Sequence, residues 1–321
     1  MSFGTKPKSC FGLLGINGAG KSTAFKMFTG DERITAGECW TAGFSLKKQK
    51  QKAQSAVGYC PQFDALIDSL TGIETLQFYC DLRGLHREDA AVSVNELLRV
   101  LDLTPHMKKE CGIYSGGNKR KLSTALAMVG EPKLLFLDEP STGMDPGARH
   151  ALWDAILKMQ ARGASIILTS HSMEECEALC SRLAIMVNGK FQCIGTVQRL
   201  RHLYGRGFTI ELSVSVSRDK ANKNDRLLEN ESKKVNELME QYFGEYGMIL
   251  KEDHQDSYQS FKVYDIPNTD EEKPVPLYYV FGKLNKLKKE TALAGFSVRQ
   301  RTLEEMFLSF TKSQREDERV Q

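Results

Sequence analysis

One short stretch constrains the fold more than any other part of the chain. It runs from Gly15 to Ser22, Gly-Ile-Asn-Gly-Ala-Gly-Lys-Ser, and fits the pattern Gly-x-x-x-x-Gly-Lys-Ser/Thr. An apolar, strand-like run, 11–14, precedes it and a helical pattern follows it. A glycine-rich loop between a strand and a helix is typical of a mostly parallel sheet covered by helices, so the sequence predicts an α/β fold.

The residue types in this loop are suited to binding phosphate. Its glycines let backbone N–H groups curl around phosphate oxygens, and the helix that follows points its positive end at the same charge. Lys21 is predicted to reach the terminal phosphates, Ser22 to coordinate Mg²⁺ and Thr23 to add a phosphate contact. A glycine-rich turn without a ligand would not explain Lys21 and Ser22 together. The predicted backbone cradle consists of Gly15, Asn17, Gly18, Ala19 and Gly20.

Two acidic residues follow a second buried run. Leu134 to Asp138 reads as a strand, and Glu139 and a proline come directly after it. Ligands in open α/β sheets bind outside the carboxyl ends of the strands. Asp138 is therefore predicted to hold Mg²⁺ and Glu139 to orient and deprotonate the water that attacks a γ-phosphate. His171 follows a third strand, 165–169, and is predicted to contact the γ-phosphate and that water.

The arrangement along the chain predicts two domains. Residues 1–205 form the first, an α/β domain into which a helical subdomain, about 64–130, is inserted. Residues 206–311 follow the order β-α-β-β-α-β, a split βαβ or ferredoxin-like α+β domain. The strand 208–216 opens this domain, and the loop 265–276 lies inside it. The segment 217–234 and the tail 312–321 are charged and are predicted to be mobile.

Composition excludes several classes of protein. Lys and Arg number 44 against 41 Asp and Glu, so no basic surface indicates nucleic acid. No window reaches the roughly 18 apolar residues of a spanning helix, and Met1 to Lys8 does not read as a secretory signal. The eight cysteines show no metal-ligand spacing and are predicted to be reduced thiols. The chain is thus predicted to reside in the cytosol.

A third motif carries a family resemblance. The segment 114–123, Tyr-Ser-Gly-Gly-Asn-Lys-Arg-Lys-Leu-Ser, resembles the signature of the ATP-binding cassette family, and Gln62 and Asp145 resemble its Q-loop and D-loop. The resemblance implies that the signature of one cassette closes on ATP held by a second, so that two cassettes form a head-to-tail dimer. It also implies that Gln62 senses Mg²⁺ and the water. The residues implied at the partner's nucleotide are Ser115, Gly116, Gly117 and Asp145.

The narrower resemblance is to the second cassette of the A subfamily, which exports phospholipids and sterols. It is carried by four segments and by Met306–Thr311, which resembles the terminal apolar motif of that subfamily. It implies a regulatory C-terminal domain and docking to membrane domains, at the cytosolic face of a membrane, that handle lipid. Family members have two strands and an adenine-stacking aromatic residue before the position of Cys10; only nine residues precede it here, so those strands are expected to be missing. The four segments are 10–18, 114–126, 136–146 and 169–180.

Three hypotheses for function remain open at this point. The first is an ATPase that powers lipid transport, with Glu139, His171 and Gln62 in catalysis. The second is a non-catalytic regulatory or interaction fragment of such a transporter, motivated by the expected absence of the first strands. The third, a cassette that works on ribosomes or chromosomes, predicts a second cassette or a long coiled coil in the chain, and the sequence contains neither.

Overall fold

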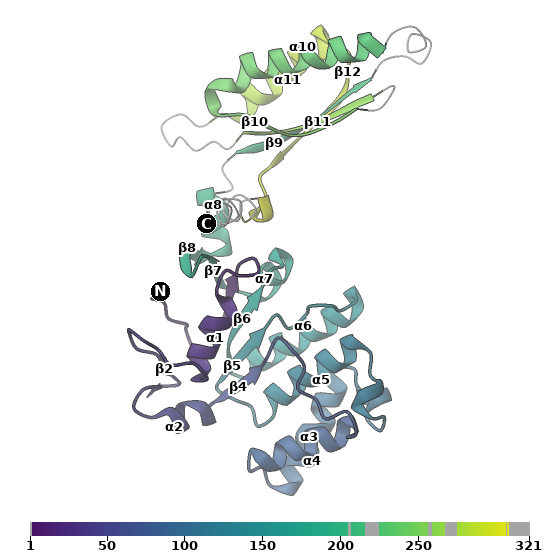
Figure 1. Ribbon diagram of the computed structural model, residues 1–321. Coiled ribbons are helices and arrows are strands. Elements are labelled where there is room, and N and C mark those ends of the chain that lie inside the picture. The colour runs from purple at the N-terminus through teal and green to yellow at the C-terminus, as the bar shows by residue number, and fades with distance from the viewer. Residues whose placement is uncertain are drawn as a thin grey trace. The chain divides into compact units, whose positions relative to one another are not determined.

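The computed structural model describes residues 2–204, 207–215, 225–255, 259–266, 275–305 and 307. These residues divide into two compact units, and the division falls after Val197 rather than at the predicted 205/206. Phe307 is grouped with the first unit, whereas the sequence placed it in the second domain. Figure 1 shows the elements of both units.

The first unit is built on a six-stranded sheet with the order β4-β5-β6-β1-β7-β8. All neighbouring pairs from β4 to β7 are parallel, and β8 joins β7 as an antiparallel hairpin. The strands predicted at 11–14, 134–138 and 165–169 are confirmed, while β4, β7 and β8 were not individually predicted. The six strands are Cys10–Leu14 (β1), Val57–Cys60 (β4), Leu134–Asp138 (β5), Ser165–Ser170 (β6), Arg182–Val187 (β7) and Lys190–Thr196 (β8).

Helices connect these strands, as the parallel topology requires. The glycine-rich loop directly precedes α1. The helix α6 connects β5 to β6, and α7 connects β6 to β7. A two-stranded ribbon of β2 and β3 lies between α1 and α2 in the sequence. The bounds are Lys21–Thr29 (α1), Trp40–Thr41 (β2), Phe44–Ser45 (β3), Lys50–Ser55 (α2), Pro146–Ala161 (α6), Met173–Leu179 (α7) and Val197–Tyr204 (α8).

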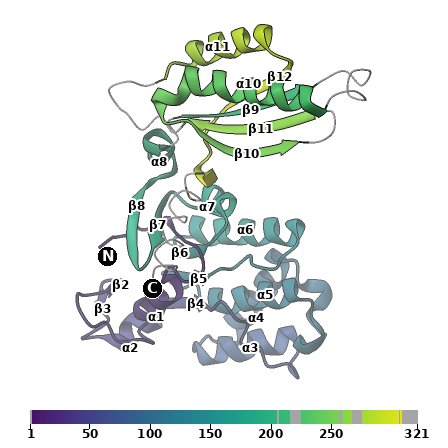
Figure 2. The same ribbon diagram turned by 45° about the horizontal axis from the view of Figure 1, so that its top comes forward.

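The predicted helical insertion lies between β4 and β5. Its helices α3, α4 and α5 lie together in the structure (Figures 1 and 2), and α5 also packs on β4. Glycine at position 58 permits this approach, because a Cβ there would lie 2.0 Å from the carbonyl oxygen of Ala127. The bounds are Gly72–Leu82 (α3), Arg87–Val100 (α4) and Gly116–Met128 (α5), with short 3₁₀ turns at Thr104–His106 and Cys111–Ile113.

A cluster of aromatic side chains packs between α1 and the strands β1 and β5. Phe25 of α1 meets Phe136 of β5 edge-on, with ring centroids 5.3 Å apart, and Phe28 stacks on Phe136. Phe3 reaches the same cluster and stacks on Phe11 of β1 at 4.8 Å. Offset and edge-to-face pairs of this kind add to the stabilisation from burial. The cluster therefore fixes α1, and with it the loop, against the centre of the sheet.

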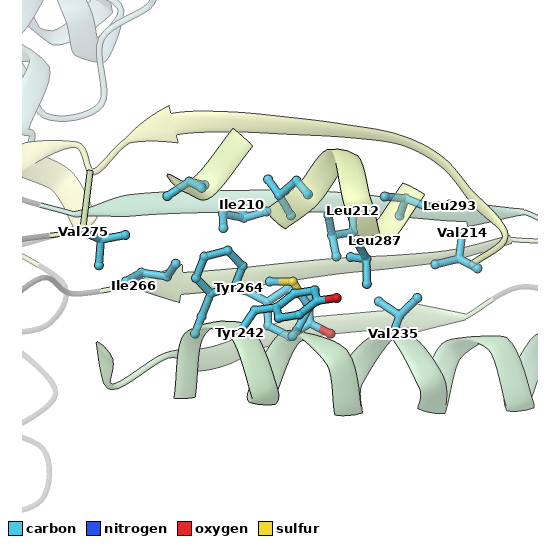
Figure 3. Packing of buried hydrophobic residues seen from close by; sticks show 14 of the residues in the cluster. Ile210, Leu212, Val214, Val235, Tyr242, Tyr264, Ile266, Val275, Leu287 and Leu293 are labelled. Carbon is cyan, nitrogen blue, oxygen red and sulfur yellow. The ribbon is translucent and has the colours of Figure 1, made fainter. Parts of the chain in front are cut away.

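The second unit has the predicted order β-α-β-β-α-β. Its antiparallel sheet has the order β10-β11-β9-β12, and α10 and α11 cover one face of it (Figure 2). Buried side chains from the sheet and from both helices form its core (Figure 3). The bounds are Phe208–Ser215 (β9), Asp225–Phe243 (α10), Ile249–Gln255 (β10), Gln259–Ile266 (β11), Leu277–Glu290 (α11) and Leu293–Gln300 (β12), with a 3₁₀ turn at Gly244–Tyr246.

Two predictions for this unit were wrong in part. The segment 217–234 was predicted to be mobile, but α10 begins at Asp225, because Leu228 and Val235 are buried in the core and anchor the first turns. The loop predicted to begin at Asp265 starts later, since β11 continues to Ile266 and Ile266 is buried. The tail 312–321 and most of the 306–311 motif lie outside the described residues.

Candidate nucleotide-binding site

The loop 15–20 has the geometry of a phosphate cradle. Gly18 and Gly20 have φ angles of 83° and 98°, in the left-handed region that favours glycine. A Cβ on Gly15 would lie 2.8 Å from the carbonyl oxygen of Met186, so this position also requires glycine. The loop ends where α1 begins at Lys21, so it lies at the positive end of that helix. The N–H groups of Gly15 and Ala19 bind the carbonyl oxygens of Ser170 and Ile16. Asn17, Gly18 and Thr23 are exposed, while Ala19 is buried.

Lys21 turns back beneath the loop. Its Nζ donates to the carbonyl oxygens of Gly15, at 2.7 Å, and of Ile16, at 3.2 Å. The same atom lies 3.3 Å from Oε1 of Glu139, and both side chains are almost fully buried. The structure thus brings together the lysine of the glycine-rich motif and Glu139, the acid that directly follows β5.

Glu139 is the centre of the site. Its φ of 49° is unusual for a residue with a side chain, and its backbone N–H is held by the hydroxyl of Thr169 at 2.9 Å. Oε2 accepts hydrogen bonds from Gln62 Nε2 at 3.3 Å and from Thr142 Oγ1 at 3.4 Å. Nδ1 of His171 lies 3.5 Å from the same oxygen. Glu139, His171 and Gln62, the three predicted catalytic residues, therefore meet at one carboxylate.

Asp138 lies beside this cluster and is buried. Its Oδ1 accepts a hydrogen bond of 2.5 Å from Thr169, which is directly opposite it in the β5–β6 register. Ser22 is half-buried in the first turn of α1. Carboxylate, hydroxyl and amide oxygens are the donors that Mg²⁺ prefers, so Asp138, Ser22 and Gln62 fit a magnesium ion in chemical type.

Burial also affects the residues next to this site. The pKa of Tyr59, in β4, is raised to about 12, mainly by burial and further by the charge of Asp138. Burial likewise raises the pKa of the Cys60 thiol, although the guanidinium of Arg120 opposes this. Both groups therefore remain protonated at neutral pH and supply no charge to the site.

The remaining predicted residues lie apart from the Lys21–Glu139 cluster. Ser115 caps α5 by accepting from the N–H of Asn118 at 3.3 Å, and it is exposed. Asp145 caps α6 by accepting from the N–H of Ala148 at 3.0 Å, which lowers the pKa of its carboxyl. A Cβ on Gly116 or Gly117 would meet nothing within 4 Å. These residues therefore present an open surface rather than a completed part of the site.

Sequence reasoning missed three residues that organise the site. Thr169 bridges the two acids, Thr142 binds Glu139, and Arg120 binds the backbone around both acids. A threonine in a strand and an arginine in a helix are common in those elements for reasons of propensity alone. The available signals were positions: Arg120 lies in the segment 114–123, Thr142 lies in the segment 136–146, and Thr169 ends the predicted strand 165–169.

Fold and site together define a P-loop nucleoside-triphosphatase, and comparisons give the family. The sequence matches the family model described as "ABC transporter" over residues 1–142. A second model, "AAA domain, putative AbiEii toxin, Type IV TA system", matches residues 114–177. A solved "ATP binding subunit of ABC transporter" is 30% identical with a TM-score of 0.58, and the match covers 62% of this chain and 83% of that one. The chain belongs to the ATP-binding cassette family of ABC transporters.

Curated relatives place the similarity within the A subfamily. The mouse (Mus musculus) "Phospholipid-transporting ATPase ABCA3" is 45% identical over 98% of this chain. The human (Homo sapiens) "ATP-binding cassette sub-family A member 2" is 44% identical over the same share. The chain spans only 17% and 12% of the lengths of these two relatives. A dimeric cassette in a post-hydrolysis state with ADP and Pi shares the fold, with a TM-score of 0.56 at 17% identity, over 60% of this chain and 88% of that one.

Proposed function

We propose that this chain binds Mg-ATP and hydrolyses it, and that hydrolysis powers lipid transport by membrane domains with which the chain assembles. The observation that carries the proposal is the meeting of Lys21 and Glu139 at 3.3 Å, with Gln62 and His171 on the other oxygen of the same carboxylate. A phosphate-binding lysine, an acid and two polar groups that orient water are the parts that phosphoryl transfer to water requires.

Each residue has a role that follows from its position. The loop amides and Lys21 would hold the β- and γ-phosphates, because they converge at the N-terminus of α1. Mg²⁺, held by Asp138, Ser22 and Gln62, would neutralise phosphate charge. Glu139 would accept the proton of the attacking water.

The exposed residues of the cassette support a proposed head-to-tail dimer. Ser115, Gly116 and Gly117 open α5, and the backbone N–H groups of its first turn have no partner within the helix. The space around the two glycines would allow a phosphate of a second cassette to approach these groups closely. We propose that Asp145 contacts the P-loop of the same second cassette.

The surface around Gln62 is proposed to receive the membrane domains. Phe63 and Ile67, in the same loop as Gln62, expose 81% and 49% of their surface. Leu82 exposes 66% and lines, with Tyr59 and Pro61, a hollow of about 300 Å³. A concentration of exposed large apolar side chains is typical of an interaction surface. Gln62, which precedes Phe63 in the chain, contacts the carboxylate of Glu139. A partner that docks on this surface would therefore be separated from the proposed catalytic carboxylate by a single side chain.

The proposal also covers the role of the second unit and the membrane at which the protein works. The second unit has the element order and strand order of a ferredoxin-like domain, and we propose that it is regulatory. Among the described residues, no helix combines the length and apolar character needed to cross a membrane. From the similarity to the A subfamily we propose that the chain acts at the cytosolic face of a membrane. The membrane domains would then transport phospholipid or sterol.

The test is steady-state ATP hydrolysis by the chain in the presence of a second cassette. Glu139→Gln keeps the shape of the side chain but removes the proton acceptor, so turnover should fall by about 10²-fold or more while ATP stays bound and dimers accumulate. Glu131→Gln, which changes an exposed acid in the same unit, is the control. Equal turnover in the parent and the Glu139 variant would remove Glu139 from the role of base.

A non-catalytic regulatory fragment, the main alternative, is not favoured. That hypothesis gives no reason for Lys21, Gln62 and His171 to converge on one buried carboxylate. It predicts that hydrolysis by the chain is absent and is unaffected by Lys21→Ala.

A further inference from the structure

Arg120 lies in the second turn of α5 and is only 4% exposed. Three of its guanidinium contacts go to consecutive backbone carbonyls at the end of β5. Nε donates to Pro140 O at 3.2 Å, and Nη2 donates to Glu139 O at 3.0 Å and to Asp138 O. A single side chain therefore holds the backbone of both acids of the candidate site.

These three carbonyls belong to a turn that needs to be held. Glu139 has a φ of 49°, a conformation that costs energy for a residue with a side chain and persists where the surroundings impose it. Thr169 binds the N–H side of this residue and Arg120 binds its carbonyl side. The direction of the Glu139 side chain thus depends on a group outside the sheet.

The same guanidinium also reaches the loop that carries Gln62. Nη1 donates to Pro61 O, and it lies 3.1 Å from the partly exposed carboxylate of Asp64. Pro61 and Asp64 lie on either side of the Gln62–Phe63 pair, and Gln62 donates to Glu139. Arg120 therefore binds both segments whose side chains meet at the catalytic carboxylate.

We propose that Arg120 is a positioning residue, which holds Glu139 and Gln62 in their mutual arrangement and couples that arrangement to the position of α5. Its planar fork serves five acceptors in fixed directions, which a lysine ammonium does not reproduce. Because α5 begins at Gly116, directly after its cap Ser115, a displacement of the N-terminus of α5 is transmitted to Glu139 through the buried side chain of Arg120. The catalytic meaning of this coupling rests on the proposed function, whereas the hold on the turn does not.

The first experiment measures that hold without any nucleotide. Hydrogen exchange followed by mass spectrometry is compared for the full chain and for Arg120→Gln, Arg120→Lys and Arg162→Gln. Arg162 is the matched control, since it is a partly exposed arginine whose ion pairs are with Glu96 and Glu131, outside the site. We expect exchange at least about tenfold faster in peptides covering 61–64 and 138–142 of both Arg120 variants, with β1 and β6 unchanged.

The second experiment separates positioning from binding. For Arg120→Gln we expect kcat to fall by about 10²-fold while KM for ATP stays within about threefold, because the bonds of Lys21 to the loop carbonyls of Gly15 and Ile16 do not involve Arg120. Arg120→Lys should remain within about tenfold of the Gln variant, and Asp64→Asn, which leaves the carbonyl contacts intact, should lose less than about threefold in kcat.

The two experiments distinguish failure of the Arg120 proposal from failure of the proposed function. Protected 138–142 peptides in Arg120→Gln, full recovery of kcat by Arg120→Lys, or faster exchange spread evenly over the first unit would each overturn the proposal. If the parent chain hydrolyses no ATP with a second cassette present, the proposed function fails, and the exchange experiment still decides whether Arg120 holds the turn.

Discussion

Lys21 Nζ and Glu139 Oε1 lie 3.3 Å apart, with both side chains about 95% buried. The lysine comes from the start of α1 and the acid directly follows β5, so the pair joins the glycine-rich loop, the proposed phosphate site, to the carboxyl end of β5. A buried charge that loses its partner is strongly unfavourable. Binding of a phosphate to Lys21 therefore competes with Glu139 for the same ammonium group.

This competition predicts the effect of neutralising the acid on affinity. In Glu139→Gln, Lys21 has lost its anionic partner, so a phosphate would supply the missing charge. We expect the Kd for ATP to fall by about tenfold, a difference of about 1.4 kcal/mol, as measured by calorimetry. The gain should vanish when Lys21→Ala is added. An unchanged or weaker affinity in Glu139→Gln would show that the ion pair does not oppose binding.

The hydroxyl of Thr169 forms hydrogen bonds with both acidic residues. It donates to Asp138 Oδ1 and accepts from the N–H of Glu139. Thr169→Val keeps the shape but leaves the buried Asp138 Oδ1 without its donor, while the Glu139 N–H keeps its 3.2 Å bond to the Thr169 carbonyl. We expect a loss of about 1–3 kcal/mol in the free energy of unfolding. Thr169→Ser keeps the hydroxyl and should lose about 1 kcal/mol. Urea unfolding of the two variants checks this, and equal losses would contradict it.

Gly116 and Gly117 differ from Gly58 in what surrounds them. A Cβ at either of the first two meets nothing within 4 Å, whereas one at Gly58 would lie 2.0 Å from a backbone oxygen. We expect Gly116→Ala and Gly117→Ala to change the free energy of unfolding by less than about 1 kcal/mol, yet to reduce nucleotide-dependent dimers in size-exclusion chromatography. Gly58→Ala should lose about 1–3 kcal/mol. Normal dimers in both signature variants would contradict the proposed interface.

The helical insertion should respond to pH through Glu74. Its Oε2 accepts from the N–H of Thr71 at 2.8 Å and from the Thr71 hydroxyl, and these bonds lower the pKa of the Glu74 carboxyl. Because the folded pKa lies below the unfolded value of about 4.3, this contribution is present above pH 4.3 and is lost as pH falls through the folded pKa. Melting temperatures of the parent and of Glu74→Gln should differ at pH 6 and converge as the pH falls below the folded pKa of Glu74. A constant difference would contradict this.

Much of the fold followed from local patterns in the sequence. The glycine-rich motif and the apolar runs beside it located β1, β5 and β6, because a buried parallel strand is a short apolar run with a polar end. The alternation at Phe208–Ser215 likewise predicted β9. By contrast, the start of α10 was predicted to be mobile because it is rich in charged residues. The helix forms there because Leu228 is buried in the core of the second unit, and a single sequence does not show that contact.

For the site, the sequence identified several of the functional side chains but not the hydrogen bonds that hold them in place. Lys21, Asp138, Glu139 and His171 were found from their types and spacing, and the structure places two of them, Lys21 and His171, beside the carboxylate of Glu139. Arg120 and Thr169 were missed, because their role depends on backbone groups of segments far apart in the chain. Such contacts leave no periodic signal in a single sequence.

The most direct test of the whole account is calorimetry of Mg-ATP binding to the chain and to Lys21→Ala. Every functional proposal passes through the phosphate cradle, and Lys21 links that cradle to Glu139. Lys26→Ala, which removes an exposed lysine from the same helix, is the control. The account predicts saturable binding to the parent and to the control, and at least about 10²-fold weaker binding to Lys21→Ala. Equal affinities in all three proteins would contradict it.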